Sequence, residues 1–140
     1  MKGHFSTSLR VRTYECDLYG HVNNAVFLNY FEMARVEFLY YLGFTLQALQ
    51  KAGFLLPIVK IEIEYKKPVF PGERLDLSLE WTKKGNSSAV FHQEALRNGE
   101  VVAAADVTWV VTDLRGRPVN MPLTILEAFK KKYPDTFHPQ

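Results

Sequence analysis

The segment Val26–Leu42 constrains the fold more than any other, because almost all of its residues are apolar or aromatic. Its polar residues are Asn29, Glu32, Arg35 and Glu37, and the first three are spaced three apart, close to one stripe of a helix. A helix with so much apolar circumference is not a surface helix with a single buried face. We therefore expect a central helix that the rest of the domain covers on most sides.

The same segment lacks the character of a membrane span. It contains three charged residues and is shorter than the roughly 20 apolar residues that cross a bilayer. The first residues, Met1–His4, contain no apolar signal stretch. The one cysteine, Cys16, excludes an internal disulfide and a cysteine-rich zinc site. We expect no membrane span and a reducing compartment such as the cytoplasm.

Alternating residues downstream predict the sheet that covers this helix. In Val59–Lys66, apolar and charged residues alternate without exception, which is typical of a strand with one buried face. Asn98–Gly99 favours a hairpin turn, and it leads into a β-branched and alanine-rich run whose small residues would let a helix approach closely. The patterns predict five strands, over about 5–14, 59–66, 75–82, 87–96 and 101–112.

The order of these elements favours an α+β domain. A strand precedes the long helix, four antiparallel strands follow it, and Pro122 can begin a last helix that runs to about Lys132. This order predicts one sheet curled around one helix. A length of 140 residues suits a single domain over residues 1–140. The net charge of +2 is not the strong basic excess of nucleic-acid-binding proteins, so we expect no nucleic-acid partner.

Polar residues gather between the first strand and the long helix, in Tyr14–Asn24. The start of a helix offers free backbone N–H groups and a positive dipole end, and both favour a developing oxyanion. A carboxylate beside such a group can act as general base or nucleophile, and Asp17 is placed for that role. The sequence has no serine-hydrolase elbow, phosphate-binding glycine loop or histidine pair with metal-ligand spacing, so we expect no metal and no cofactor.

The same residues also admit purely structural roles. Asp17 begins a four-residue stretch with glycine at its fourth position, which is the preference of a type I turn. Asn23 or Asn24 can cap the helix, and His21 can be a core or turn histidine. Cys16 is a poor thiolate site, since the neighbouring carboxylate raises the pKa of the thiol. The residue pattern by itself leaves catalysis and turn formation both open.

The string Asp17–Asn24, followed by Ala25–Arg35, resembles the hotdog-fold thioesterases, most closely their acyl-CoA and 4-hydroxybenzoyl-CoA branch. The resemblance covers nearly the whole chain and includes Tyr65–Glu73, which is similar to the family's edge-strand and turn segment. It implies a hotdog fold, in which an antiparallel sheet of about five strands wraps around one long helix. It also implies an enzyme that hydrolyses an acyl-CoA to a free acid and CoA.

The resemblance further implies a homodimer or homotetramer with active sites between protomers. An oligomer would also cover the surface and edge of the long strand expected over 101–112. The family's catalytic carboxylate falls on Asp17, as the nucleophile or as the base that activates water. Its oxyanion donor falls on the backbone N–H of Asn24. His21 receives a supporting role, because Tyr19 stands where the related plant acyl-carrier-protein thioesterases have an asparagine.

Three groups of residues are expected to hold the substrate. The segment that matches a family region facing the acyl pocket from the partner chain is Pro57, Ile58 and Val59. The aromatic residues of the long helix that we expect to line that pocket are Phe27, Tyr30 and Phe31. Lys66 and Lys67, with Arg74 as a further candidate, would hold the CoA phosphates as point charges. Alternatively, these lysines are solvated charges that protect the end of a strand.

Two other functions stay open. A hotdog hydratase or dehydratase would need a histidine and a carboxylate, here His21 and Glu32, to meet in space. Another hotdog branch takes its catalytic carboxylate from the middle of the long helix. Glu32 and Glu37 lie there and are the alternatives to Asp17 as the catalytic carboxylate. A non-catalytic protein that binds acyl-CoA is the alternative outside enzymes, and measurable turnover distinguishes an enzyme from it.

Overall fold

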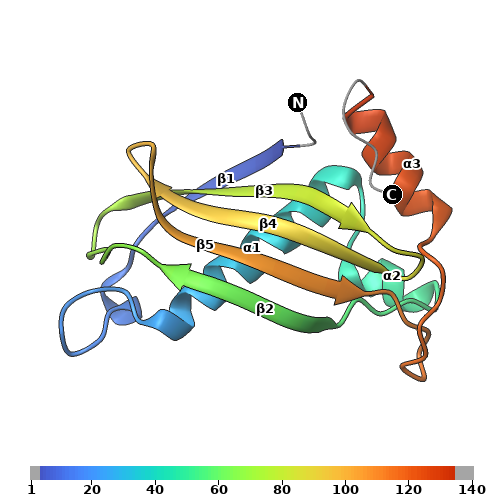
Figure 1. The fold of residues 1–140 in the computed structure, drawn as a ribbon, viewed down its shortest axis with the longest axis horizontal. Helices are drawn as coiled ribbons and strands as arrows, with labels where there is room; N and C mark the ends of the chain where they lie inside the picture. Colours follow the sequence, from blue (N-terminus) through green and yellow to red (C-terminus); the bar gives the residue numbers. More distant parts are fainter. Residues whose placement is uncertain (1–3, 135–140) are drawn as a thin grey trace.

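Five strands form one antiparallel sheet, and a long helix crosses one of its faces (Figure 1). The structure is a computed structural model that describes residues 4–134. The strands pair in the order β1-β3-β4-β5-β2. The elements are β1 (His4–Arg10), the 3-10 helix η1 (Thr13–Glu15), α1 (Asn24–Leu42), α2 (Leu46–Lys51), β2 (Ile58–Tyr65), β3 (Arg74–Lys84), β4 (Ser88–Arg97), β5 (Glu100–Val110) and α3 (Leu123–Lys132). The α+β class and the hotdog arrangement are confirmed.

Local signals at both ends define the long helix α1. The side chain of Asn23 accepts a hydrogen bond from the N–H of Ala25 at 2.8 Å, so Asn23 is the N-cap. Gly43 ends the helix in the left-handed conformation, with φ of 97°. Leu42, the end of the apolar segment, is therefore the last helical residue, and the helix begins at Asn24, where the sequence predicted its start.

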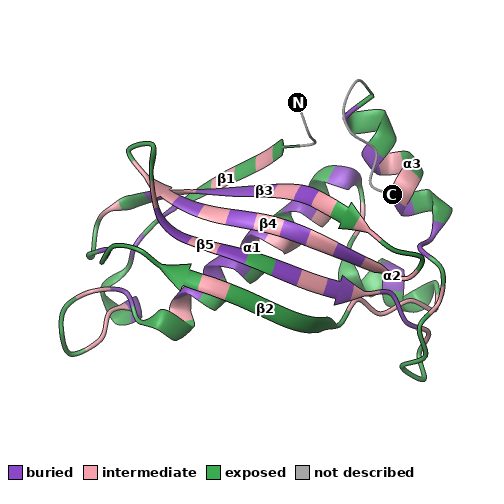
Figure 2. Ribbon diagram, viewed as in Figure 1, coloured by how far each residue is buried: buried purple, intermediate pink, exposed green. Residues whose placement is uncertain are grey.

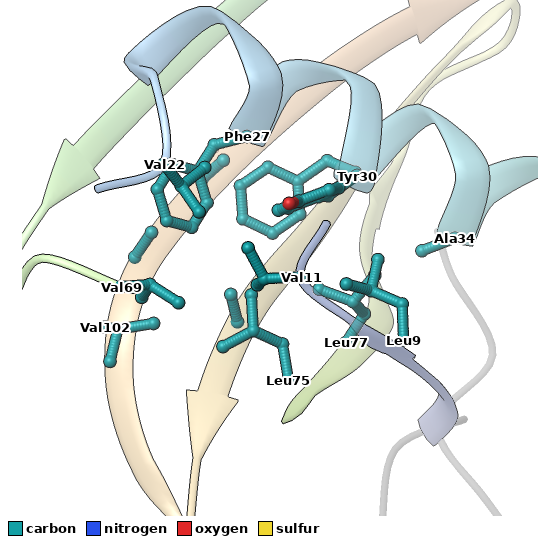
Figure 3. Packing of buried hydrophobic residues seen from close by; sticks show 14 of the residues in the cluster. Leu9, Val11, Val22, Phe27, Tyr30, Ala34, Val69, Leu75, Leu77 and Val102 are labelled. Atoms are coloured by element: carbon teal, nitrogen blue, oxygen red, sulfur yellow. The ribbon is translucent and has the colours of Figure 1, made fainter. Parts of the chain in front are cut away.

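The sheet covers α1 on one side only. The buried residues of the helix recur three or four positions apart and are Phe27, Tyr30, Phe31, Ala34, Phe38 and Leu42. Several of them pack on apolar side chains of the sheet and of the loop before the helix (Figure 3). Tyr40 is 52% exposed and Tyr41 is 43% exposed. The prediction that the domain covers the helix on most sides is therefore wrong for the single chain.

The strand β2 differs most from the prediction. It pairs only with β5 within the described residues, so it forms one edge of the sheet, and most of it is exposed (Figure 2). Val59 is 59% exposed, Tyr65 is 41% exposed, and only Ile63 is half-buried. A bulge between Ile58 and Lys60 shifts the register at Val59. The alternation of residues identified the strand, but the predicted buried face is wrong in the single chain.

The other predicted strands and the last helix are present, with shifted ends. The first strand stops at Arg10 rather than near Tyr14, because η1 begins at Thr13. The strand β5 lies between β4 and β2, so the expectation that it leaves an open edge is wrong. The short helix α2 was not predicted, and Thr45 caps it. Among the described residues, no helix combines the length and the apolar character that a membrane crossing requires.

Candidate active site

The loop before α1 folds Asp17 into a tight turn. The backbone N–H of Asp17 donates to the carbonyl of His21 at 2.9 Å, and the N–H of Gly20 donates to the carbonyl of Asp17 at 3.0 Å. Oδ1 of Asp17 accepts the N–H of Tyr19 at 2.9 Å. Gly20 has φ of 84°, which a residue with a side chain rarely adopts. The predicted turn is confirmed, and one carboxylate oxygen helps to hold it.

The second carboxylate oxygen of Asp17 takes no part in the hydrogen bonds of the turn. Oδ2 forms no hydrogen bond with any of residues 4–134, and it lies 3.9 Å from Nδ1 of His21, beyond hydrogen-bonding distance. The Asp17 side chain is 24% exposed, so the carboxylate is largely screened from water but still accessible. Tyr19 and Phe70 contact the imidazole of His21, with ring centroids 6.3 and 6.4 Å away. The structure therefore brings Asp17 and His21 side by side.

The start of α1 supplies a backbone donor near this carboxylate in the sequence. Asn23 caps the helix through its side chain and also accepts the N–H of Val26 through its carbonyl. The N–H of Asn24 has no hydrogen-bond partner among the described residues, as expected for the first turn of a helix. The hydroxyl of Tyr65 donates to the carbonyl of Asn24 at 2.9 Å and ties the helix start to the end of β2.

A buried glutamate supports this loop, and the sequence analysis did not identify it. Glu15 is 8% exposed, and its Oε1 accepts both the hydroxyl of Tyr30 at 2.9 Å and the N–H of Arg12 at 2.8 Å. Its carbonyl accepts the N–H of Asn23 at 3.1 Å. Burial, and then the hydrogen bond to Glu15, raise the pKa of Tyr30. Tyr30 lies fifteen positions further along the chain, so no local pattern predicts this contact.

The thiol next to Asp17 is a poor nucleophile, as predicted. Burial raises the pKa of Cys16, and the carboxylates of Asp17 and Glu15 raise it further. Its Sγ lies 3.8 Å from the carbonyl of Arg12. Within the described part of the chain, no group of three His, Cys, Asp or Glu side chains is placed to hold a metal ion.

The expected substrate-binding residues lie at opposite ends of β2. Ile58 begins the strand and Val59 follows it, with Pro57 directly before. Lys66 and Lys67 follow its last residue, at the end where Tyr65 bonds Asn24. A single chain therefore does not bring Pro57–Val59 to the start of α1. Lys67 Nζ pairs with Oε2 of Glu100 at 2.9 Å, whereas Lys66 forms no ion pair with any described residue.

An apolar cavity of about 100 Å³ lies beside the C-terminal half of α1. Side chains of all three α-helices and of β2, β3, β4 and β5 line it, and Glu32 and Arg35 are the charged ones among the described lining residues. The prediction that Phe27, Tyr30 and Phe31 line a pocket is wrong for the single chain. These three side chains are at most 3% exposed and belong to the core.

Comparisons with known proteins agree with this fold. Residues 11–129 match the model of the family described as the thioesterase-like superfamily. The acyl-CoA thioesterase YbgC of Haemophilus influenzae is 32% identical over 127 residues, an alignment that covers 89% of this chain and 93% of that protein. The crystal structure of a hypothetical protein from Aquifex aeolicus has a TM-score of 0.85 and 28% identity, and the match covers 90% of this chain and 99% of the other.

A plant relative is longer than this chain. The chloroplastic acyl-acyl carrier protein thioesterase ATL3 of Arabidopsis thaliana is 31% identical over 125 residues, which are 86% of this chain. The aligned region is 65% of the plant protein, so this chain spans just under two thirds of its length. The family match covers most of the described residues and agrees with the hotdog arrangement of sheet and helix. The chain therefore belongs to the thioesterase-like superfamily.

Proposed function

We propose that this protein hydrolyses an acyl-CoA thioester to a free acid and CoA. Membership in a thioesterase superfamily supports thioester hydrolysis as the reaction class. The name of the Haemophilus relative supports acyl-CoA as the substrate, whereas the plant relative is named for acyl groups on a carrier protein. One observation carries the proposal within this chain: an accessible carboxylate oxygen of Asp17 precedes a helix whose first N–H has no partner among residues 4–134.

Two mechanisms use these groups, and both give the same products. As general base, Asp17 takes a proton from water while the water oxygen attacks the thioester carbonyl carbon. As nucleophile, Oδ2 attacks that carbon itself, and water then hydrolyses the resulting anhydride. In each case the backbone N–H of Asn24 donates to the carbonyl oxygen as negative charge develops on it. In the general-base route the C–S bond then breaks, and the CoA sulfur takes the proton that Asp17 removed from water. In the nucleophilic route the C–S bond breaks as the anhydride forms, before water hydrolyses it, and the sulfur takes a proton from solvent.

The hydratase alternative finds less support. His21 contacts Asp17, Tyr19 and Phe70 in the loop before α1. Glu32 lies eight positions after Asn24, about 12 Å further along the helix axis, where it lines the apolar cavity. No hydrogen bond or ion pair joins His21 and Glu32 in the described part of the chain. The proposed base therefore remains Asp17 rather than a His21–Glu32 pair.

The proposal includes an oligomer that forms through β2. This strand has an unpaired edge in the single chain, and its exposed apolar side chains include Ile58, Val59, Ile61 and Tyr65. An exposed strand edge of this kind is a site for pairing with another chain. Antiparallel pairing of two β2 strands would bring the first residues of one strand to the last residues of the other. Pro57–Val59 of one chain would then approach the helix start of its partner.

A panel of substrates tests the reaction. Acetyl- to palmitoyl-CoA, benzoyl-CoA and hydroxybenzoyl-CoA are incubated with the purified protein, and release of the free thiol is measured. We expect turnover of at least one member. In parallel, exchange of the protons next to the carbonyl is followed in deuterated water. Exchange without thiol release would support the hydratase, and binding without either reaction would support a non-catalytic acyl-CoA-binding protein.

A further inference from the structure

The residues around Asp17 form a small hairpin, and its two arms carry the two groups of the proposed site. The N–H of Asp17 donates to the carbonyl of His21 at 2.9 Å, and the N–H of Asn23 donates to the carbonyl of Glu15 at 3.1 Å. The residues between these two hydrogen bonds form an antiparallel bridge. The first arm ends in Asp17, and the second arm leads into the start of α1. The position of Asp17 relative to that helix therefore depends on what holds each arm.

The second arm is fixed from β2 and from the segment that follows it. The hydroxyl of Tyr65, the last residue of β2, donates to the carbonyl of Asn24 at 2.9 Å. The N–H of Val22 donates to the carbonyl of Val69 at 2.8 Å, and both valines are buried in the same apolar cluster. The start of α1 is thus held in place without any contribution from Asp17.

The first arm is fixed by the buried carboxylate of Glu15, two positions before Asp17. Oε1 accepts the hydroxyl of Tyr30 at 2.9 Å and the N–H of Arg12 at 2.8 Å, and Oε2 pairs with the guanidinium of Arg12 at 3.0 Å. The contact with Arg12 is local and caps η1. The contact with Tyr30 is not local, because Tyr30 lies in α1, six positions after Asn24. It holds the arm that carries Asp17 against the helix whose first N–H is the proposed oxyanion donor.

Packing alone does not account for a carboxylate at this place. Glu15 is 8% exposed, and Tyr30 is 3% exposed and lies among the core side chains under α1 (Figure 3). Removing a carboxylate from water costs free energy, and apolar side chains of similar volume are often at least as stabilising. A hydrogen bond adds a fixed direction that apolar contacts lack. Burial, and then the hydrogen bond to Glu15, raise the pKa of Tyr30, so its hydroxyl stays protonated and donates throughout the neutral pH range.

We propose that Glu15 and Tyr30 are positioning residues, and that their hydrogen bond sets the carboxylate of Asp17 relative to the first N–H of α1. This inference rests on the proposed function, in which Asp17 is the base or nucleophile and the N–H of Asn24 is the oxyanion donor. Both groups must reach one thioester carbonyl together, and a misplacement of about 1 Å can lower a rate about a hundredfold. Loss of the pair should therefore lower kcat and leave substrate binding nearly unchanged.

Tyr30→Phe tests the pair, because it removes one hydroxyl and keeps the ring. We expect kcat for the best acyl-CoA substrate to fall about ten- to hundredfold, with KM within about twofold of wild type. Glu15→Ala removes the acceptor and should lower kcat at least as much. Glu15→Gln keeps an acceptor oxygen for both donors, so its kcat should stay within about threefold of wild type. Adding Tyr30→Phe to Glu15→Ala should lower kcat no further, because both changes remove the same hydrogen bond.

Tyr133→Phe is the matched control, because it also removes the hydroxyl of a buried tyrosine. That hydroxyl donates to the carbonyl of His4 at 3.3 Å, and the ring lies against Tyr41 near the C-terminal end of α1. The control should keep kcat within about twofold of wild type even where its Tm falls as far as that of Tyr30→Phe. The positioning role is overturned if Tyr30→Phe keeps kcat within twofold, or loses activity through KM alone. It is also overturned if Glu15→Gln loses as much as Glu15→Ala, since that indicates an effect of charge rather than position.

Amide hydrogen exchange separates this inference from the proposed reaction. The N–H groups of Asp17 and Asn23 hold the two arms of the hairpin together, so a loosened arm exposes them to exchange more often. We expect both to exchange at least about tenfold faster in Tyr30→Phe and at the wild-type rate in Tyr133→Phe. Faster exchange in Tyr30→Phe, with no turnover of any thioester by the wild-type protein, would refute the proposed function but keep the anchoring of Asp17 by this pair. Wild-type turnover, with exchange and kcat both unchanged in Tyr30→Phe, would refute the positioning role alone.

Discussion

At the scale of the residue, Asp17 combines a structural and a chemical role in one carboxylate. Oδ1 accepts the N–H of Tyr19 and helps to form the turn, while Oδ2 has no hydrogen-bond partner among residues 4–134. This division explains why a turn preference and a catalytic preference coincide at one position of the sequence. It also provides a substitution that separates the two roles, because asparagine keeps an acceptor oxygen and loses the charge.

Asp17→Asn should therefore lower kcat by roughly a hundredfold or more while the protein stays folded. Asp113→Asn is the matched control: Oδ1 of Asp113 likewise accepts backbone N–H groups, from Arg115 at 2.9 Å and Arg117 at 3.0 Å. Steady-state thiol release and thermal unfolding of both variants give the comparison. Asp17→Asn retaining more than a tenth of wild-type kcat at an equal Tm would show that Asp17 is only a turn residue.

The two lysines after β2 differ in their surroundings, although both are exposed. Lys67 already pairs with Glu100, whereas Lys66 has no ion-pair partner in the described chain and is the stronger candidate for a CoA phosphate. Lys66→Ala should raise KM for acyl-CoA several-fold with little change in kcat, the pattern of lost binding common to ground and transition states. Lys67→Ala should raise it less.

The effect of Lys66→Ala should also shrink at high salt and disappear with an acyl-pantetheine, which lacks the nucleotide phosphates. These kinetics are measured for both variants with both substrates. An unchanged KM for acyl-CoA, or an equal loss on acyl-pantetheine, would return Lys66 to the role of a solvated strand-end charge.

At the scale of the element, the sheet carries a row of ionisable side chains on the face opposite α1. Cross-strand pairing aligns Glu80 of β3, His92 of β4, Asp106 of β5 and Glu62 of β2. Nδ1 of His92 lies 2.8 Å from Asp106, and Nε2 lies 3.0 Å from Glu94. Partial burial lowers the pKa of His92, but the hydrogen bonds to these two carboxylates outweigh it and raise the pKa above its usual 6.5.

A raised pKa means that the folded protein holds this proton more tightly than the unfolded chain. The contribution of His92 to stability is therefore fully present below pH 6.5 and is lost as the pH rises through the raised value. His92→Gln removes this titration. We expect the wild-type Tm to gain more than that of His92→Gln between pH 8.5 and about pH 6, with both variants followed by thermal unfolding. Parallel Tm profiles would show that the ion pairs around His92 contribute no measurable stability.

At the scale of the whole molecule, two elements each expose several apolar side chains among residues 4–134 of the single chain. One is the edge strand β2, and the other is the outer side of α1, where Leu28, Tyr40 and Tyr41 are exposed. Burying apolar area is the main favourable contribution to association, and an open strand edge adds backbone hydrogen bonds to it. The proposed oligomer accounts for both features of β2, its exposed apolar residues and its unpaired edge.

Val59→Glu should therefore convert the oligomer to a monomer of 16.1 kDa at micromolar concentration. Leu114→Glu is the control, because both side chains are 59% exposed in the single chain and Leu114 lies in the loop after β5 rather than in the edge strand. Sedimentation gives the mass of each variant and of the wild-type protein. A wild-type monomer that retains full activity would argue against active sites shared between chains.

The sequence by itself determined the elements that depend on local periodicity. The apolar run of α1, its capping asparagine and the strand alternation in Val59–Lys66 are properties of neighbouring residues, so they predicted helix and strands to within a few positions. The candidate site followed from the residue types in Asp17–Asn24 and from a family resemblance. The helix α2 was missed because six residues are too few to show a helical period.

The tertiary structure alone decided which predicted surfaces are buried. Alternation shows that two faces of a strand differ, but the pairing order decides that β2 is an edge and β5 is internal. Contacts between distant positions, such as Glu15 with Tyr30, leave no local pattern. The cavity exists only where seven elements meet. Local geometry is encoded in neighbouring residues, whereas burial depends on which distant residues pack against them.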